Sequence, residues 1–318
     1  MPSDPVLTIP PDQGGGTSDS SLAAAITRAA SKQTYYTVRF LVDRDRVPDA
    51  YRAYAYFRWV DDWLDQVDLD KALRVDFLSR QQALVAACYR GDVLGHLTPE
   101  EGLLVDLLRG DHSQSTGLRA YVSNMMDVMA FDTERRGRLI SQDELTGYTH
   151  HLATAVTEAL HYFIGHRCVS PQCQARYQAA TAAHITHMLR DTLEDTQAGY
   201  FNIPRELLEL HGIDVGDVES DPYRMWVKNR VRLARLSFET GKSYLSRVKN
   251  LRCRLAGFAY IARFEGVLDA IQEDGYILRA GYPEAKSLGA GVRLFCSSFA
   301  RALTSPGSGE WSSTLTAR

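Results

Sequence analysis

The sequence contains no run of about 18 uninterrupted apolar residues, which is the length that a membrane-spanning helix needs. Its N-terminal segment has prolines, serines and a Gly14-Gly15-Gly16 run without the basic and apolar regions of a secretory signal, so we expect a tail there and no signal peptide. Glycine-rich phosphate loops, a nucleophile elbow and repeats of fixed period are also missing. The usual sequence marks of membrane spans, nucleotide-binding loops and serine hydrolases are therefore absent.

Cysteine and net charge are both low. The 5 cysteines are odd in number and lack paired CxxC spacing, so neither a zinc ribbon nor a disulfide framework is predicted. This cysteine usage fits a reducing, cytoplasmic location. The formal net charge of -3 leaves no basic footprint of the kind that nucleic-acid binding requires. We therefore expect a cytoplasmic protein without a nucleic-acid partner.

Helical periodicity dominates what is present. Apolar residues make up 45% of the chain and recur at three- and four-residue steps, as they do on one face of a helix, while alternating strand patterns are scarce. The periodic segments are 51–64, 71–89, 118–130, 143–164, 172–197, 225–248 and 253–272. The pattern predicts one all-α domain over residues 22–303, between an N-terminal tail, 1–21, and a C-terminal tail, 304–318.

Two aspartate-rich segments lie within these helices: Arg58-Trp59-Val60-Asp61-Asp62-Trp63-Leu64-Asp65 and Arg190-Asp191-Thr192-Leu193-Glu194-Asp195. Residues four apart stack along a helix, so Asp61 and Asp65 share one face, as do Asp191 and Asp195. A lone pair with this spacing is ordinarily a solvated acidic face. Here aromatic residues surround the first pair and an arginine precedes each pair, which favours a semi-buried site.

Carboxylates beside an arginine suit a diphosphate held by magnesium. Mg²⁺ prefers oxygen ligands and is commonly bound by a few carboxylates together with substrate phosphate oxygens. The planar guanidinium of Arg58 or Arg190 carries a fork of donors that matches phosphate oxygens. Two such faces, opposed across a cavity, would form a metal-diphosphate clamp.

Several ordered segments resemble the motifs of the squalene/phytoene synthase family. They are Ser31-Lys32, Arg58 to Asp65, Gly147-Tyr148-Thr149-His150-His151-Leu152-Ala153-Thr154-Ala155-Val156, and Leu189 to Asp195. The later run Arg254-Leu255-Ala256, followed by Gly266 to Ile271 and Gly275-Tyr276, is similar to the closing helix of that family. Order and spacing agree over roughly residues 30–280, which is most of the chain.

The resemblance implies a single-domain isoprenoid synthase fold, an all-helical bundle around a central cavity. It also implies about two or three Mg²⁺ ions bridging the motifs to an allylic diphosphate. The implied metal ligands are Asp61, Asp62, Asp65, Asp191 and Asp195. The implied diphosphate-binding residues are Lys32, Arg58, Arg190 and Arg254, and the implied catalytic residues are Asp61, Asp65, Asp191, Asp195, Arg58 and Arg190.

Members of this family join two prenyl diphosphates head to head in isoprenoid biosynthesis, giving phytoene, dehydrosqualene or, with NADPH, squalene. The resemblance therefore implies a prenyltransferase, with farnesyl or geranylgeranyl diphosphate as the expected substrate. Two alternatives stay open: a class I terpene cyclase that uses one prenyl diphosphate on the same fold, and a non-catalytic family member. The retained aspartates argue against the second. No dinucleotide fingerprint supports NADPH use, and the sequence leaves that question open.

Some positions depart from the family pattern. His184 and His187 stand where the family has glutamine and asparagine, and their spacing places them on the helix face of Asp191. Either they replace hydrogen-bonding amides, or they ligate metal or act as acid or base near neutral pH. Tyr200 begins the stretch Tyr200-Phe201-Asn202-Ile203-Pro204, where the family reads arginine, any residue, tyrosine. Tyr148 is an aromatic ring that either packs in the core or stabilises a carbocation.

A row of basic residues lies on the helix predicted over 225–248. It comprises Lys228, Arg230, Arg232, Arg235 and Lys242. Such a row is ordinarily a solvated face, and it also suits anionic lipid or a second diphosphate. The sequence therefore leaves peripheral membrane contact open.

Overall fold

Side-chain caps fix several helix ends. The computed structural model describes residues 17–66, 69–92, 95–109, 116–165 and 170–282. Ser141 begins α7 (Gln142–Phe163): its Oγ accepts from the N–H of Glu144, whose carboxylate accepts the N–H of Ser141. Asp70 caps α4 (Lys71–Arg90) and Asn250 caps α12 (Leu251–Glu273) in the same way, each through a side-chain oxygen.

Helices account for the regular structure of the described residues. The other α-helices are α1 (Thr17–Ala30), α2 (Lys32–Leu41), α3 (Val47–Leu64), α5 (Pro99–Arg109), α6 (Thr116–Arg135), α8 (Gln178–Arg190), α9 (Thr192–Gln197), α10 (Arg205–His211) and α11 (Asp221–Ser246). Two short 3-10 helices, η1 (Arg44–Arg46) and η2 (Gln174–Tyr177), precede α3 and α8. Within the same ranges no strand forms, and Ile140 and Pro204 make an isolated bridge. The predicted all-α class is confirmed.

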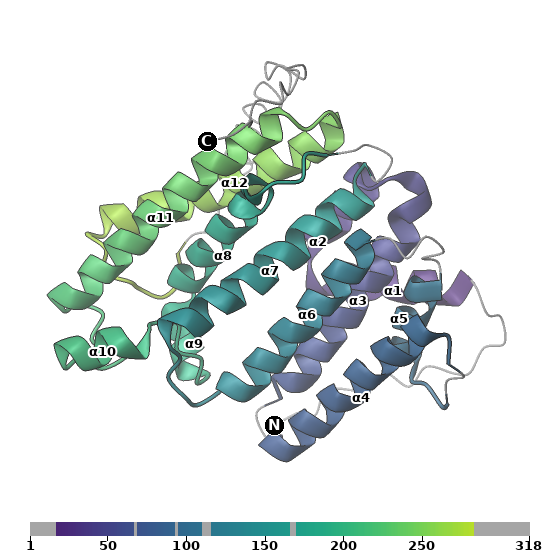
Figure 1. Cartoon of the computed structure of the whole chain (residues 1–318), viewed down its shortest axis with the longest axis horizontal. Helices are drawn as coiled ribbons and strands as arrows, with labels where there is room; N and C mark the ends of the chain where they lie inside the picture. Colours follow the sequence, from purple (N-terminus) through teal and green to yellow (C-terminus); the bar gives the residue numbers. More distant parts are fainter. Residues whose placement is uncertain (1–16, 67–68, 93–94, 110–115, 166–169, 283–318) are drawn as a thin grey trace, which may run out of the picture.

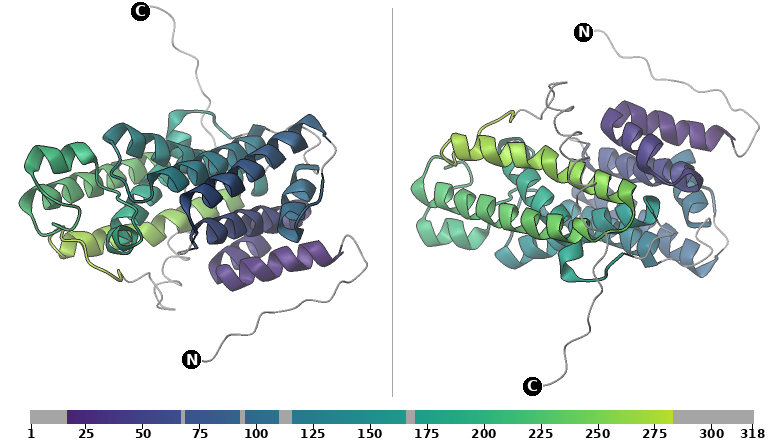
Figure 2. Two further views of the ribbon diagram at one scale, coloured as in Figure 1. Left: turned by 90° about the horizontal axis from the view of Figure 1, so that it is seen from below. Right: turned by 90° about the horizontal axis from the view of Figure 1, so that it is seen from above.

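The helices pack in a bundle around α3, α6, α7 and α8, which run side by side (Figure 1). On one flank α11 and α12 pack against α8, and on the other α1 packs against α3. Figure 2 shows α1 on the outside of the bundle in both views. One large cluster of buried apolar side chains spans these helices, with Tyr56, Phe238 and Leu104 among its fully buried members. The bundle holds α3 and α8, the carriers of the aspartate motifs, in fixed positions.

Helix bounds differ from the prediction in four places. α1 begins at Thr17, so residues 17–21 of the predicted tail are helical, and α1, α2 and α5 lie outside the predicted periodic segments. α10 also lies outside the predicted periodic segments. The helix predicted over 172–197 is interrupted at Asp191. Residues 1–16, the predicted C-terminal tail 304–318 and the end of the predicted domain, 283–303, lie outside the described residues.

None of the described helices is long and apolar enough to cross a bilayer.

Candidate active site

The first aspartate motif occupies the C-terminal end of α3. Asp61 and Asp65 line a polar cavity, and Asp65 is the C-cap that follows the last helical residue, its N–H donating to the carbonyl of Asp61 at 2.9 Å. Asp62 lies outside that lining, with 55% of its side chain exposed. The opposite face carries Trp63, which stacks on Phe77 of α4 at 3.8 Å between ring centroids. The aromatic residues thus anchor one side of the helix end while two carboxylates face the cavity.

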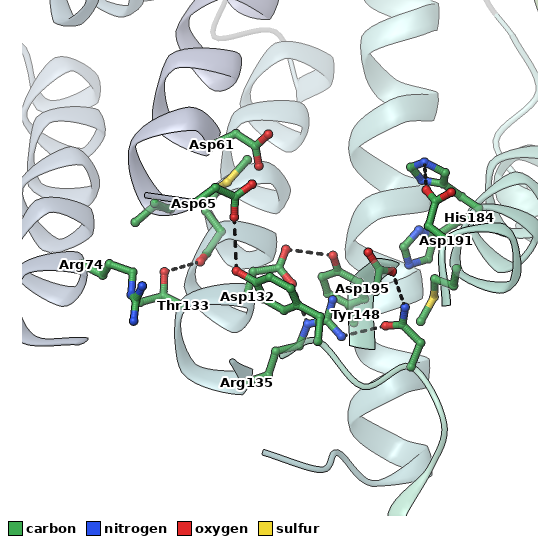
Figure 3. Close-up of a pocket in the computed structure, with 16 residues that line it drawn as sticks. Asp61, Asp65, Arg74, Asp132, Thr133, Arg135, Tyr148, His184, Asp191 and Asp195 are labelled. Carbon is green, nitrogen blue, oxygen red and sulfur yellow. Dashed lines mark hydrogen bonds and ion pairs between the residues drawn. The ribbon is translucent and has the colours of Figure 1, made fainter. Parts of the chain in front are cut away.

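The second motif spans a helix break. Asp191 ends α8 and also begins α9, with φ -98 and ψ 7, so the predicted continuous helix over 172–197 is wrong at this point. The N–H of Asp195 still donates to the carbonyl of Asp191 at 2.8 Å, which keeps the two side chains about one turn apart. Both line the same cavity as Asp61 and Asp65. The structure therefore opposes the two motifs across one space (Figure 3).

Two adjacent cavities share part of their lining, including the carboxylates of Asp61 and Asp132. The polar cavity has a volume of about 290 Å³ and the apolar one about 580 Å³. Both are lined by Asp61, Met129, Asp132, Tyr148, His184 and His187. Val38, Phe57, Leu152 and Phe163 are among the apolar residues that line only the larger cavity. Figure 3 shows the polar cavity, with Asp61 and Asp65 on one side and Asp191 and Asp195 on the other.

Two residues that sequence reasoning missed, Asp132 and Arg135, link Tyr148 to the second motif. Asp132, on α6, accepts from Arg135 Nε at 2.6 Å and from Tyr148 Oη at 2.8 Å. Arg135 Nη1 donates to Asn202 Oδ1 at 2.9 Å, and Asn202 Nδ2 donates to Asp195 Oδ2 at 2.6 Å. One sequence signal was available, because Asp132 follows the apolar run Met129-Ala130-Phe131 and an acid so placed needs a partner.

Two tyrosines line the polar cavity. Tyr200 Oη donates to Asp65 Oδ1 at 3.3 Å, which links the loop after the second motif to the end of α3. Arg135 lies over the rings of Tyr148 and Tyr200, at 4.7 and 5.0 Å from their centroids. Tyr148 and Tyr200, singled out in the sequence, therefore belong to the cavity wall, where their rings already face a cation of the protein.

The carboxylates differ in pKa. Burial and the neighbouring Asp65 raise the pKa of Asp61 to about 6. Burial raises the pKa of Asp195 to about 6 as well, against the hydrogen bond from Asn202. Burial also acts on Asp191, but hydrogen bonds from Arg190 and His187 outweigh it and hold its pKa below the ordinary value. The cavity therefore favours added positive charge beside Asp61 and Asp195.

The two histidines have different surroundings. His187 Nε2 lies 2.9 Å from Asp191 Oδ2, within hydrogen-bonding distance. His184 is buried, its ring packs edge-on against Tyr148 at 5.0 Å, and neither ring nitrogen has a hydrogen-bond partner among the described residues. Burial and the nearby His187 lower the pKa of His184 to about 3, so its imidazole is neutral. Both rings line the two cavities, as their shared helix face predicted.

The four expected diphosphate-binding residues are scattered. Arg58 lines the apolar cavity and pairs with Asp61, at 3.4 Å, and with Asp62. Arg190 is held by Asp191 through two contacts of 2.5 and 2.7 Å. Lys32 is exposed at the start of α2 and Arg254 is half-buried on α12, and neither lines the two cavities. The four motif aspartates in the polar cavity thus share one lining, whereas the four expected diphosphate-binding residues do not.

Comparison with known proteins identifies the family. A match to the squalene/phytoene synthase family spans residues 27–287, which is more than half of the chain. The chain belongs to the squalene/phytoene synthase family. It is 28% identical over 209 residues to the presqualene diphosphate synthase of Zymomonas mobilis, covering 64% of this chain and 67% of that protein. It is 25% identical over 252 residues to the phytoene synthase of Thermus thermophilus, covering 78% and 81%.

Solved structures of the family share the fold. A squalene synthase from Alicyclobacillus acidocaldarius superposes with a TM-score of 0.63 at 20% identity, covering 82% of this chain and 96% of that one. A dehydrosqualene synthase superposes with a TM-score of 0.68 at 16% identity, covering 89% and 96%. The predicted isoprenoid synthase fold is confirmed. As a squalene/phytoene synthase, the protein is a prenyltransferase of isoprenoid biosynthesis that condenses prenyl diphosphates head to head.

Membership also implies Mg²⁺-dependent chemistry, and the donor set agrees with it. Among the described residues no three His, Cys, Asp or Glu side chains converge on a single point. Mg²⁺ seldom needs such a cage, because it keeps several waters and is usually held by one or two carboxylates plus substrate phosphates. Carboxylates on opposite walls, two of them with raised pKa, fit ions that are bound together with a diphosphate.

Proposed function

We propose that this squalene/phytoene synthase couples two molecules of farnesyl or geranylgeranyl diphosphate in the two adjoining cavities. The observation that carries the proposal is that a polar cavity with carboxylates on both walls adjoins an apolar cavity of about 580 Å³, with which it shares six lining residues. A prenyl diphosphate has the matching polarity, with a charged head and a long apolar chain. The head would lie among the carboxylates and the chain among residues such as Val38, Phe57 and Phe163.

The carboxylate roles follow from their positions. Asp61 and Asp65 would hold about two or three Mg²⁺ ions from one wall, and Asp191 and Asp195 from the other. When bound, Mg²⁺ neutralises the charge that develops on the departing diphosphate. Asp62 is outside the cavity lining and pairs with Arg58, so we assign it to the positioning of Arg58. Asn202 and Arg135 would keep Asp195 and Asp132 oriented.

The apolar cavity protects the carbocation that remains after ionisation. Its lining is mostly aliphatic and aromatic, and this excludes the water that would quench an allylic cation. Tyr148 Oη is already bonded to Asp132, which makes its ring electron-rich beside both cavities. We assign Tyr148 to cation stabilisation, whereas its neighbour Phe131, at 5.2 Å between ring centroids, lines neither cavity.

Product identification tests the proposal. The protein would be incubated with geranyl, farnesyl and geranylgeranyl diphosphate, with and without Mg²⁺ and NADPH, and the products resolved by mass. Coupling gives a product with twice the carbon number of its donor, C30 from farnesyl and C40 from geranylgeranyl diphosphate, in a reaction that requires Mg²⁺, and a C30 product whose hydrogen count changes with NADPH would identify a reductive step. Products that keep only the carbon number of their donor would identify a cyclase and overturn the proposal. Absence of product from every donor would indicate a non-catalytic member.

Peripheral membrane contact is a further part of the proposal. On α11, Arg235 pairs with Asp269 and Lys242 with Glu239 and Glu265, whereas Lys228 and Arg232 are exposed. The exposed pair would face anionic lipid. Sedimentation with anionic and with neutral vesicles tests this contact, and equal sedimentation with both would contradict it.

A further inference from the structure

Arg74 has no assigned role, yet it lines the polar cavity. It lies in the first turn of α4, on the wall that also carries Asp65 and Thr133 (Figure 3). Sequence reasoning did not select it, because it stands outside both aspartate motifs. It lines the polar cavity but not the apolar one. Its guanidinium is therefore placed at the part of the two adjoining cavities that is farther from the proposed prenyl chain.

The guanidinium of Arg74 differs from those of the other arginines near the carboxylates in its lack of a hydrogen-bond partner among the described residues. Arg58 pairs with Asp61 and Asp62, Arg135 with Asp132 and Asn202, and Arg190 with Asp191. Nε and Nη1 of Arg74 are shielded from water and have no hydrogen-bond partner among the described residues. No ion pair of the described residues involves Arg74 either, although carboxylates line the same cavity.

Such an arrangement is costly unless an anion completes it. A buried donor without an acceptor loses its hydration without compensation, and a charged donor loses more than a neutral one. A guanidinium has planar, paired donors that match two oxygens of a phosphoryl group. Arg58 and Arg190 would have to loosen contacts with motif aspartates before binding phosphate, whereas Arg74 has no such contact to break.

We propose that Arg74 is an additional diphosphate-binding residue, which holds the phosphoryl group farther from the prenyl chain. This assignment rests on the proposed function of the cavity. Because charge on the diphosphate increases when the C–O bond breaks, Arg74 would bind the released diphosphate and also stabilise the transition state. Its removal should therefore weaken binding of inorganic pyrophosphate and lower kcat with farnesyl diphosphate.

The test uses Arg74→Met, Arg74→Lys and the control Lys71→Met, which removes a positive charge from an exposed position one turn earlier on α4. The Kd of inorganic pyrophosphate in the presence of Mg²⁺ would be measured by calorimetry. Arg74→Met should raise this Kd by about ten- to a hundredfold, Arg74→Lys by less, and Lys71→Met by less than about twofold. Farnesol, which lacks the diphosphate, should bind equally well to all four proteins.

The outcomes separate this assignment from the proposed function. If the wild-type protein binds pyrophosphate and Arg74→Met binds it equally well, Arg74 is not a ligand and only this assignment fails. An equal loss of pyrophosphate affinity in Lys71→Met would show that the effect comes from overall charge, and it would also overturn the assignment. If the wild-type protein does not bind pyrophosphate with Mg²⁺, the proposed function fails with it. If Arg74→Met lowers the Tm, the assignment is decided by Arg74→Lys, which retains the positive charge. An affinity of Arg74→Lys for pyrophosphate between those of the wild-type protein and Arg74→Met would support direct contact of Arg74 with the diphosphate.

Discussion

The carboxylates of the polar cavity differ in charge before any ligand binds. Near neutral pH Asp191 is ionised beside Arg190 and His187, while Asp61 and Asp195, with pKa values of about 6, retain part of their protons. Burial raises the pKa of Asp132 too, against the opposing effect of Arg135. Cations that enter this cavity would displace protons, so their affinity should increase as the pH rises through about 6.

The raised pKa of Asp61 gives a test in the metal-free protein. The Asp61 carboxyl has its ordinary pKa of 3.8 in the unfolded state and a pKa of about 6 in the folded state, so the folded state binds the proton more tightly. Proton binding at Asp61 therefore stabilises the fold at low pH, and this contribution is lost as the pH rises through about 6. The Tm of Asp61→Asn relative to the wild-type protein should therefore rise by a few degrees as the pH increases from about 4 to about 6.5. Scanning calorimetry with a chelator measures the difference, and a difference independent of pH would contradict the assignment.

His184 provides a second test at the level of one side chain. Both ring nitrogens are buried without a hydrogen-bond partner in the described part of the chain, and an apolar group of similar shape would remove that cost. His184→Phe, which can keep the edge-on contact with Tyr148, should leave the free energy of unfolding unchanged or raise it by about 1 kcal/mol in urea titrations at pH 7.5. A loss of more than about 1 kcal/mol would mean that the imidazole has a partner in solution.

Single residues were predictable where a pattern repeats. Asp61, Asp65, Asp191 and Asp195 could be selected because each pair has helical spacing, and all four line one cavity. The partnership of Arg135 with Asn202 joins residues 67 positions apart, and no local spacing marks such a contact. Arg74 was not selected from the sequence either. Its buried donors lack a partner among the described residues, and this becomes visible only in the folded structure.

At the level of elements, the break between α8 and α9 shapes the second wall. Asp191 belongs to both helix ends, and Arg190 and His187 bind its carboxylate from the preceding turn. Neither glycine nor proline marks the break, so the sequence read as one helix. The small helix α1 was missed for a different reason: its buried positions include Ala23 and Thr27, which give a weak apolar pattern. Strongly periodic helices such as α3 and α7 were predicted correctly.

Packing of α8 against α11 depends on a glycine. A Cβ added at Gly241 would lie 2.8 Å from both Cβ and the backbone N of Ala179, and that backbone cannot move aside cheaply. Gly241→Ala should lower the free energy of unfolding by about 1–3 kcal/mol and reduce turnover through the displaced second motif. The control is Gly266→Ala on α12, where an added Cβ meets nothing within 4 Å and helix propensity improves. Equal effects of the two substitutions in denaturant titrations would contradict this packing.

On the scale of the whole molecule, the fold brings residues of α2, α3, α4, α6, α7, α8 and α9 around the two adjoining cavities. The polar cavity takes its carboxylates from α3, α6 and the junction of α8 with α9. The fold class could be predicted from periodicity and ordered motifs. The cavity walls could not, because side chains from distant helices such as Val38, Tyr121 and Phe163 meet only after packing. Under the proposed function, those walls would set the length of the prenyl chain.

Release of diphosphate from farnesyl or geranylgeranyl diphosphate tests the central claim, that the two opposed aspartate motifs act as one ionising site. It would be measured with Mg²⁺ for the wild-type protein, Asp61→Asn, Asp195→Asn and the control Asp76→Asn, an exposed position on α4. We predict that each motif variant loses about a hundredfold or more in rate, while the control retains wild-type activity. Unchanged release in either motif variant, in a correctly folded protein, would contradict the claim.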